Sequence, residues 1–193
     1  MKRTLLSLLL LCGFAFGQDE QPILYDHESG VNLGMSLIGG GIGFGYRKYI
    51  NRSYSYSGTV SLVWVRDPKE FTYIDYYGYA RKINGNNTVI LVPLQFDIRR
   101  RLFTEDIDES FQPFVNLGVG IVPGMNFPQK GNDETALTGM IFTGAGFTIV
   151  SSDRVAITIS LQLQGIVFPK EFGVRKDYST LLLQATIAKL KRK

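Results

Sequence analysis

Two reactive residue types are almost missing from this 193-residue chain, which has one cysteine, Cys12, and one histidine, His27. The single cysteine excludes a disulfide scaffold and a cysteine-ligated metal. His27 lies in "YDHESG", ahead of the first expected strand. A catalytic histidine needs a positioned partner, so we interpret His27 as a surface residue and expect neither enzymatic activity nor a cofactor.

The chain also has little net charge and almost no helical periodicity. Its formal charge is +4, from 21 basic and 17 acidic side chains. Loss of Lys2 and Arg3 with a leader would reduce it to about +2, which is too small to indicate nucleic-acid binding. After residue 17 no apolar run is long enough for a membrane-spanning helix.

The N-terminal residues resemble a secretory leader. Lys2 and Arg3 precede an apolar run from Leu5 to Leu11, and "AFG" then gives a small-x-small cleavage pattern. This order predicts a signal peptide over residues 1–17. Cys12 could also be read as a lipoprotein attachment site, but a small residue is expected before such a cysteine and Leu11 stands there.

The remaining residues alternate between apolar and small polar side chains with period two, which predicts strands. Eight runs follow this pattern, over residues 31–37, 42–47, 54–64, 90–98, 111–121, 137–149, 155–164 and 181–187. The faces opposite the aliphatic rows are mostly Gly, Ser, Thr, Asn and Gln. A narrow barrel interior suits small polar residues, whereas a water-facing sheet usually carries Lys and Glu.

The connections alternate between short and long. "INRS" and "SSD" are short, whereas residues 67–86, 124–136 and 169–177 form long links. Outer-membrane barrels have short periplasmic turns and long outer loops. We therefore expect the long links to lie together, opposite both termini, with residues 39–41 as a tight turn. An alternative count makes residues 31–49 one strand and adds "FTYIDYYGYA" as another.

The sequence thus predicts an all-β fold: a single antiparallel up-and-down eight-stranded transmembrane β-barrel after a cleaved signal peptide. The expected division is a leader over 1–17, a periplasmic segment over 18–30, a barrel over 31–190 and a basic tail over 191–193. The leading alternative is a soluble periplasmic lipocalin-like barrel with inverted faces, which would bind an apolar ligand inside.

Two stretches resemble a known family. "VILVPLQFDI" and "FQPFVNLGVGIVPG" are similar to the PorT-like outer-membrane β-barrel domains of Bacteroidetes-type bacteria, with Pro93, Phe111, Pro113, Phe114, Gly118 and Gly120 at matching places. The likeness extends over about residues 30–190 and implies a small barrel, with assembly or secretion machinery as one possible role. The chain departs from outer-membrane barrels at its end, "LLLQATIAKLKRK", which lacks the usual terminal aromatic residue.

Two groups of side chains are candidate functional residues. The first is a polar network expected inside the barrel, where unpaired charges are costly: Arg47, Asp97, Arg99 and Arg101. We interpret it as a charged plug, with an ion or solute pathway as the alternative. The second is a possible binding surface in the longest link, where function tends to concentrate: Phe71, Tyr73, Tyr76, Tyr77 and Tyr79.

Two other motifs are discounted. "GGGIGFG" lacks the lysine and helix of a phosphate-binding loop, and "FTEDIDES" lacks the spacing of a calcium loop. We therefore expect a non-enzymatic outer-membrane protein with a structural, adhesive or binding role. Its expected partners are outer-membrane lipid and the barrel assembly machinery.

Overall fold

The computed structural model describes residues 25–65, 71–83, 87–104, 107, 110–128, 132–152, 154–173 and 175–192. The predicted signal peptide, Cys12 and all four acids of "FTEDIDES" lie outside the described residues. Twelve strands are present among those described, and ten of them form one sheet. No helix in this part of the chain is long and apolar enough to cross a membrane.

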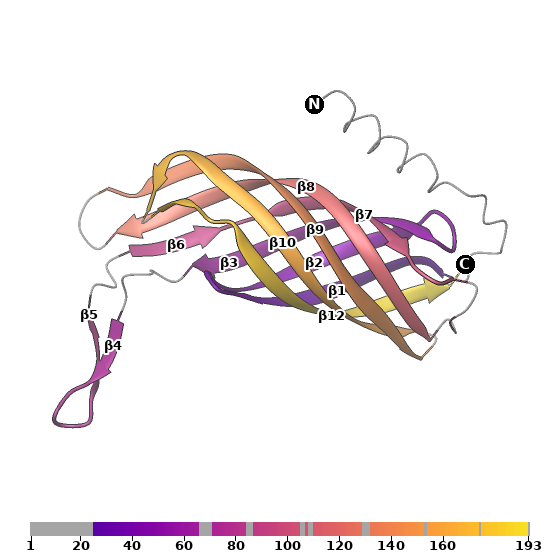
Figure 1. The fold of residues 1–193 in the computed structure, drawn as a ribbon, viewed down its shortest axis with the longest axis horizontal. Coiled ribbons are helices and arrows are strands. Elements are labelled where there is room, and N and C mark those ends of the chain that lie inside the picture. Colours follow the sequence, from indigo (N-terminus) through magenta and orange to yellow (C-terminus); the bar gives the residue numbers. More distant parts are fainter. Residues whose placement is uncertain are drawn as a thin grey trace.

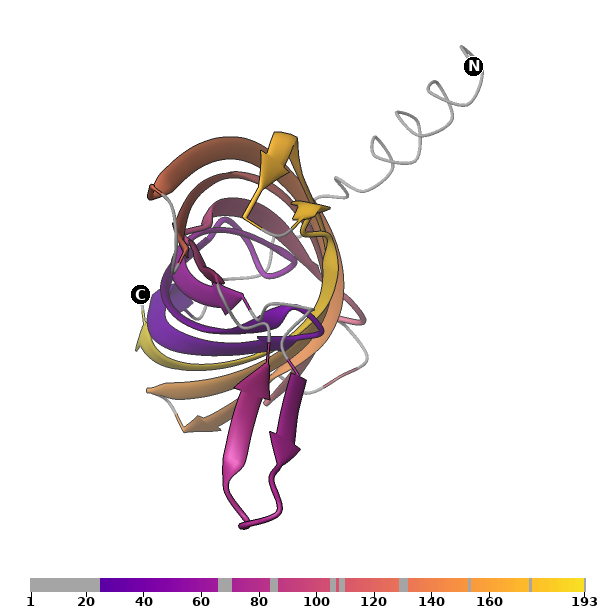
Figure 2. The same ribbon diagram turned by 90° about the vertical axis from the view of Figure 1, so that its left-hand side faces the viewer.

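The large sheet closes into a barrel of eight antiparallel staves (Figures 1 and 2). Seven staves are single strands: β1 (Tyr25–Ser36), β2 (Gly39–Tyr49), β3 (Tyr54–Val65), β8 (Phe111–Pro128), β9 (Glu134–Ser152), β10 (Val155–Phe172) and β12 (Thr180–Arg192). β12 pairs with β1, with Val31 opposite Ile187, and this pairing closes the ring. The predicted eight-stranded barrel is therefore confirmed.

The remaining stave consists of β6 (Asn87–Leu91) and β7 (Leu94–Arg101), separated at Val92 and Pro93. Pro93 has no N–H and so cannot donate to the sheet. The register continues across the break, because Leu91 pairs with Gly124 and Leu94 pairs with Ile121 on β8. Pro93 still accepts a hydrogen bond at its carbonyl from the Ser61 N–H, at 3.1 Å.

Several predicted boundaries differ from the structure. β1 begins at Tyr25, inside the segment expected to precede the barrel, and β12 extends to Arg192, inside the expected tail. These ends are strands because they pair with each other, His27 opposite Lys191. The turn between β1 and β2 is Leu37–Ile38, and the expected turn residues 39–41 begin β2.

The long links lie at one end of the barrel, which we call the loop end. The other end, where β1 begins and β12 finishes, we call the terminal end (Figure 1). Much of the expected loop sequence at 124–136 and 169–172 is strand, because β8, β9 and β10 run past the rest of the barrel. The short strand β11 (Arg175–Asp177) folds back on β10.

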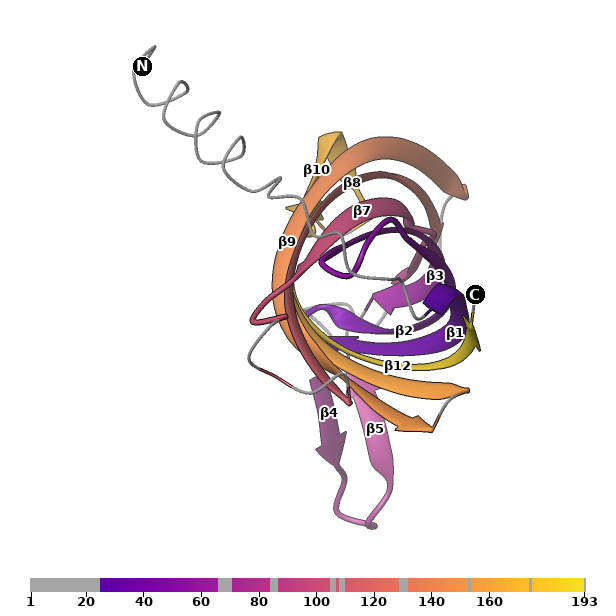
Figure 3. The ribbon, with the colours of Figure 1, turned by 90° about the vertical axis from the view of Figure 1, so that its right-hand side faces the viewer.

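Residues 71–83 form neither a ninth stave nor an irregular loop. β4 (Phe71–Ile74) and β5 (Ala80–Ile83) pair only with each other. The hairpin projects from the loop end, away from the barrel (Figures 1 and 3). The alternative strand count, which placed this stretch in the barrel wall, is therefore wrong.

Candidate functional site

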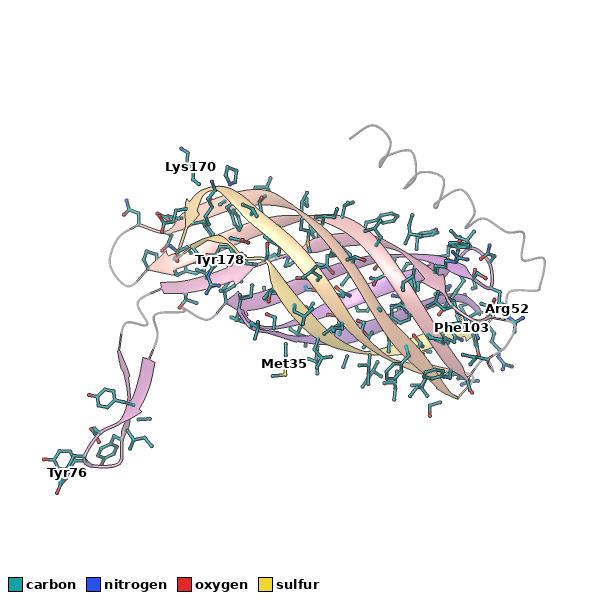
Figure 4. All side chains as sticks on the ribbon, in the orientation of Figure 1. Met35, Arg52, Tyr76, Phe103, Lys170 and Tyr178 are labelled. Atoms are coloured by element: carbon teal, nitrogen blue, oxygen red, sulfur yellow. The ribbon has the colours of Figure 1, made fainter. Side chains whose placement is uncertain are left out.

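The outer face of the barrel is aliphatic. The side chains predicted to point outward are exposed or half-buried in the structure: Val60, Leu62, Trp64, Ile90, Val92, Leu94, Val115, Leu117, Ile157 and Ile159. Further rows continue around the ring on β1, β2, β9 and β12, for example Leu33 at 59% and Ile187 at 65% exposure. Figure 4 shows side chains projecting all around the wall. Soluble monomers rarely expose apolar surface on this scale.

The interior of the terminal half is polar. Ser57, Asn116 and Gln162 are buried there, as the alternation predicts, and Ser61, Gln95 and Gln184 line the small cavities within. Each strand therefore separates two environments, because adjacent residues point to opposite faces.

An ion pair lies in this polar half. Glu28 on β1 is 3% exposed and accepts hydrogen bonds from the Arg47 guanidinium and from the Tyr49 hydroxyl, the latter at 2.8 Å. Glu28 and Arg47 are directly opposite in the β1–β2 register, so the backbone pairing sets their distance. A buried charge of either sign is stable only with such a partner.

A second polar group surrounds Asp97 on β7. The Ser57 hydroxyl donates to its carboxylate at 2.7 Å, from the opposing residue of β3. Arg99, two residues on, donates to the Thr148 hydroxyl at 3.4 Å, and its guanidinium lies 3.4 Å above the Phe114 ring centre. The ring supports the guanidinium through a cation–π contact.

The structure therefore brings Arg47, Asp97 and Arg99 together around one cavity that Glu28 also lines. Arg101 lies nearer the terminal end, at a smaller cavity that it shares with Arg52 and Arg99. Sequence reasoning missed Glu28 and Tyr49. The period-two alternation could have found them. Glu28 lies on the same face of β1 as Asn32, and Tyr49 lies on the same face of β2 as Arg47, so both side chains point inside.

The interior has little free space. Three small cavities lie inside the barrel, with volumes of about 30 Å³ at mid-barrel, about 40 Å³ beside Glu28 and about 20 Å³ beside Arg101. A water molecule needs roughly 10–15 Å³ of such space, so each cavity accommodates one to a few water molecules. Within the described residues, the polar side chains thus fill the barrel rather than line a wide channel.

The interior of the loop half is apolar, which the sequence analysis did not predict. Its buried cluster contains Ile38, Val65, Val89, Leu91, Val122, Met140, Phe142, Ile166, Phe168, Phe172 and Tyr178. The expectation of a mostly small and polar interior is wrong here because the strands of this half carry large apolar side chains on both faces. The cluster seals the barrel by packing.

The segment after β10 covers this cluster. Tyr178 is fully buried and its hydroxyl donates to the Phe172 carbonyl at 2.6 Å, while the Phe168 and Phe172 rings stack at 4.8 Å. The Ser179 N–H donates to Asp177 at 2.8 Å, and hydrogen bonds from Ser179 lower the pKa of that carboxyl. These contacts fix the fold-back of β11.

The projecting hairpin presents tyrosines to solvent. Tyr76, Tyr77 and Tyr79 are 98%, 79% and 68% exposed, and Tyr73 is 38% exposed. Asp75 shapes the tip by accepting hydrogen bonds from the Tyr77 and Tyr79 N–H groups at 3.0 and 2.9 Å. Figure 4 shows Tyr76 at the far end of the hairpin. Phe71 begins β4, but its side chain is outside the described set.

Residues with catalytic potential are sparse in the described part of the chain. His27 forms a hydrogen bond with the adjacent Asp26 at 2.9 Å and lies 5.3 Å from the Tyr46 ring, at the terminal end. No group of three or more His, Cys, Asp or Glu residues is arranged to hold a metal ion among the described residues.

No family model and no curated protein matches this chain. Among solved structures, Neisserial surface protein A superposes with a TM-score of 0.61 at 9% identity, covering 84% of this chain and 94% of that one. The N-terminal β-barrel domain of Pseudomonas aeruginosa OprF gives 0.55 at 11% identity, covering 85% and 96%.

At such low identity these similarities show the fold alone. The fold is that of the eight-stranded outer-membrane β-barrels, which agrees with the outward aliphatic rows and the polar interior of the terminal half. The PorT-like family assignment stays a prediction.

Proposed function

We propose that this chain is a non-enzymatic outer-membrane β-barrel whose projecting hairpin binds a partner outside the cell. The observation that supports membrane placement most strongly is the aliphatic outer face. A lipid-facing band about 25 Å tall is characteristic of such barrels. The lipocalin-like alternative needs the aliphatic rows inside, whereas Leu117 and Ile187 are 60% and 65% exposed.

The loop end is proposed to face outward and the terminal end to face the periplasm. Two connections at the terminal end are tight, residues 50–53 between β2 and β3 and 153–154 between β9 and β10, and the third, residues 102–110 between β7 and β8, is of medium length. At the loop end the β3–β6 connection carries a whole hairpin. Short periplasmic turns and longer outer loops are the rule in this class.

The hairpin is suited to binding because it is ordered by its own pairing and contributes nothing to barrel closure. Tyrosines supply large contact area with few rotatable bonds and keep a polar tip, so exposed tyrosines on a stable support are typical of recognition surfaces. A purely structural barrel would not need this arm. Contacts with assembly or secretion machinery remain a prediction from the family likeness.

Membrane placement is tested by fractionation of cells expressing the chain. We expect the protein to stay in the envelope after high-salt and carbonate washing and to enter solution only with detergent. Protease added to intact cells should cut first within residues 66–86. Release by salt alone would contradict membrane placement, and first cleavage at residues 50–53 would reverse the orientation.

The binding role is tested with a double variant, Tyr76→Ser with Tyr77→Ser, in cells that display the protein. We expect reduced adhesion to plates coated with fibronectin or mucin, with unchanged surface amounts of the protein. The matched control is Tyr46→Ser on the lipid-facing side of β2. Equal adhesion of wild type and double variant, or no adhesion above cells lacking the protein, would overturn the role of the hairpin.

A further inference from the structure

The barrel wall is incomplete between β9 and β10 at the loop end. The two strands pair from Ser152 and Val155 up to Met140 and Ile166, and then separate. Above that point β9 stays paired with β8, as far as Glu134, while β10 pairs with β11. Two strand edges therefore face each other without forming a ladder.

A hydrogen bond marks the base of this gap. The Thr138 hydroxyl on β9 donates to the Val167 carbonyl on β10 at 2.6 Å. This contact is made by a side chain, so it holds the edges together where the backbone ladder has ended. The wall is closed below Thr138 and open above it.

A groove occupies the gap, and we call it the β9–β10 groove. Its lining comprises Glu134, Thr135, Ala136, Leu137, Phe168, Pro169, Lys170, Glu171 and Phe172. The volume of the groove is about 340 Å³, against about 30 Å³ for the mid-barrel cavity. Unlike the barrel interior, it has the size of a ligand site.

The apolar floor of the groove covers the apolar cluster of the loop half. Phe168 and Phe172 are 0% and 3% exposed beneath it, so the accessible apolar surface is that of Ala136, Leu137 and Pro169. The rim is polar, with exposed Glu134, Lys170 and Glu171. Figure 4 shows Lys170 at the rim and Tyr178 beneath it at the loop end.

The groove begins where the lipid-facing rows end. Leu137 and Val167, 61% and 51% exposed, are the last aliphatic residues of the outward rows of β9 and β10. Beyond them the outward positions are Thr135, Pro169 and Glu171. The groove thus opens beside the level at which acyl chains meet polar headgroups, and its apolar floor is continuous with the lipid-facing surface.

We infer that the β9–β10 groove binds the acyl chain of a membrane lipid from the leaflet at the loop end. This inference rests on the proposed membrane placement. The chain would enter sideways past Leu137 and lie on Ala136 and Pro169, with its headgroup among the charged rim residues. Water at headgroup level can satisfy the open strand edges, which could not be left bare deeper in hydrocarbon.

An inserted peptide strand fits the groove less well. A strand gains its affinity by hydrogen bonding to an open edge, and Pro169 removes one donor from the edge of β10. Proline is one of the residues that protect edges from pairing. An acyl chain needs only apolar surface, which the floor supplies.

The test uses the full chain in phosphatidylethanolamine–phosphatidylglycerol vesicles with a small fraction of phosphatidylcholine that has a photoreactive diazirine on one acyl chain. Adducts are mapped by mass spectrometry after illumination. We expect adducts at Ala136 and Pro169, which line the groove and are accessible, and at Leu117 in the lipid-facing belt. Met140 and Phe142, which face inward behind the closed wall, should stay unlabelled.

Ala136→Phe fills the groove, and Ala185→Phe is the matched control, an outward position on β12. We expect Ala136→Phe to reduce labelling of Pro169 by roughly tenfold relative to Leu117, as the loss of two buried methylenes would. Ala185→Phe should leave that ratio unchanged. If Ala136→Phe fails to fold, unlabelled phosphatidylcholine that replaces part of the phosphatidylethanolamine should reduce the Pro169 adduct of the wild type relative to the Leu117 adduct.

The outcomes separate the two proposals. Adducts at Leu117 but none at Ala136 or Pro169 would overturn the groove inference and leave membrane placement standing. Absence of adducts at Leu117 as well would overturn both. A ratio of Pro169 to Leu117 labelling that neither Ala136→Phe nor unlabelled phosphatidylcholine reduces would show that no specific site exists, and a dimer joined along β9 would show that a second copy occupies the gap.

Discussion

Replacing Leu117 with Arg tests the membrane placement through stability. Leu117 is 60% exposed and lies midway along the outward row of β8 from Phe111 to Ile121. A row of this length matches the roughly 9–11 residues that a tilted strand needs to cross hydrocarbon. The substituted guanidinium would therefore lie near the bilayer midplane.

The loss of unfolding free energy caused by Leu117→Arg depends on what surrounds the barrel. Arginine at the midplane of a barrel costs about 2–4 kcal/mol. If the barrel were surrounded by water, the same change at an exposed position would alter stability by about 0.5 kcal/mol or less. The two costs differ only if the side chain at position 117 points outward, as the exposure of Leu117 in the structure shows.

The assay is denaturant unfolding of protein folded into phospholipid vesicles, with the free energy of unfolding obtained by linear extrapolation. Ile74→Arg is the control, because Ile74 is 74% exposed but lies on the projecting hairpin. We expect a loss of about 2–4 kcal/mol for Leu117→Arg and almost none for Ile74→Arg. Equal stability of the two variants would refute the lipid-facing belt.

Three further variants test the interior. Glu28→Gln should lose about 3–5 kcal/mol in the same unfolding assay because Arg47 keeps a buried charge without its partner, and adding Arg47→Gln should restore much of the loss. Tyr178→Phe should cost about 1 kcal/mol by removing the hydrogen bond from its hydroxyl to the Phe172 carbonyl, and unchanged unfolding would contradict the role of that hydroxyl in the cover over the apolar cluster. Gly118→Ala should cost about 1–3 kcal/mol because its methyl group would overlap a core ring. Gly58→Ala, where the methyl group meets no atom within 4 Å, should be neutral or stabilising, and similar values for both glycines would argue against the close packing at Gly118.

The sequence by itself determined the strands and which residues share a face. Alternation is a local property of the backbone, since adjacent side chains point to opposite sides, so the placement of Leu117 and Asn116 on opposite faces follows from the residues alone. The small polar residues of one face predicted that this face lies inside, and the exposure of Leu117 in the structure agrees with it. The same parity places Arg47, Asp97 and Arg99 inside, and it would have placed Glu28 there had the first strand been extended to its true start.

Only the tertiary structure decided which residues meet. The pairing of Glu28 with Arg47, the continuation of one stave across Pro93 and the exclusion of residues 71–83 from the wall all depend on the register of neighbouring strands. Register is fixed when the sheet closes, by the stagger that eight strands require. The separation of β9 from β10 above Thr138 also depends on pairing partners, because there β9 stays with β8 while β10 pairs with β11.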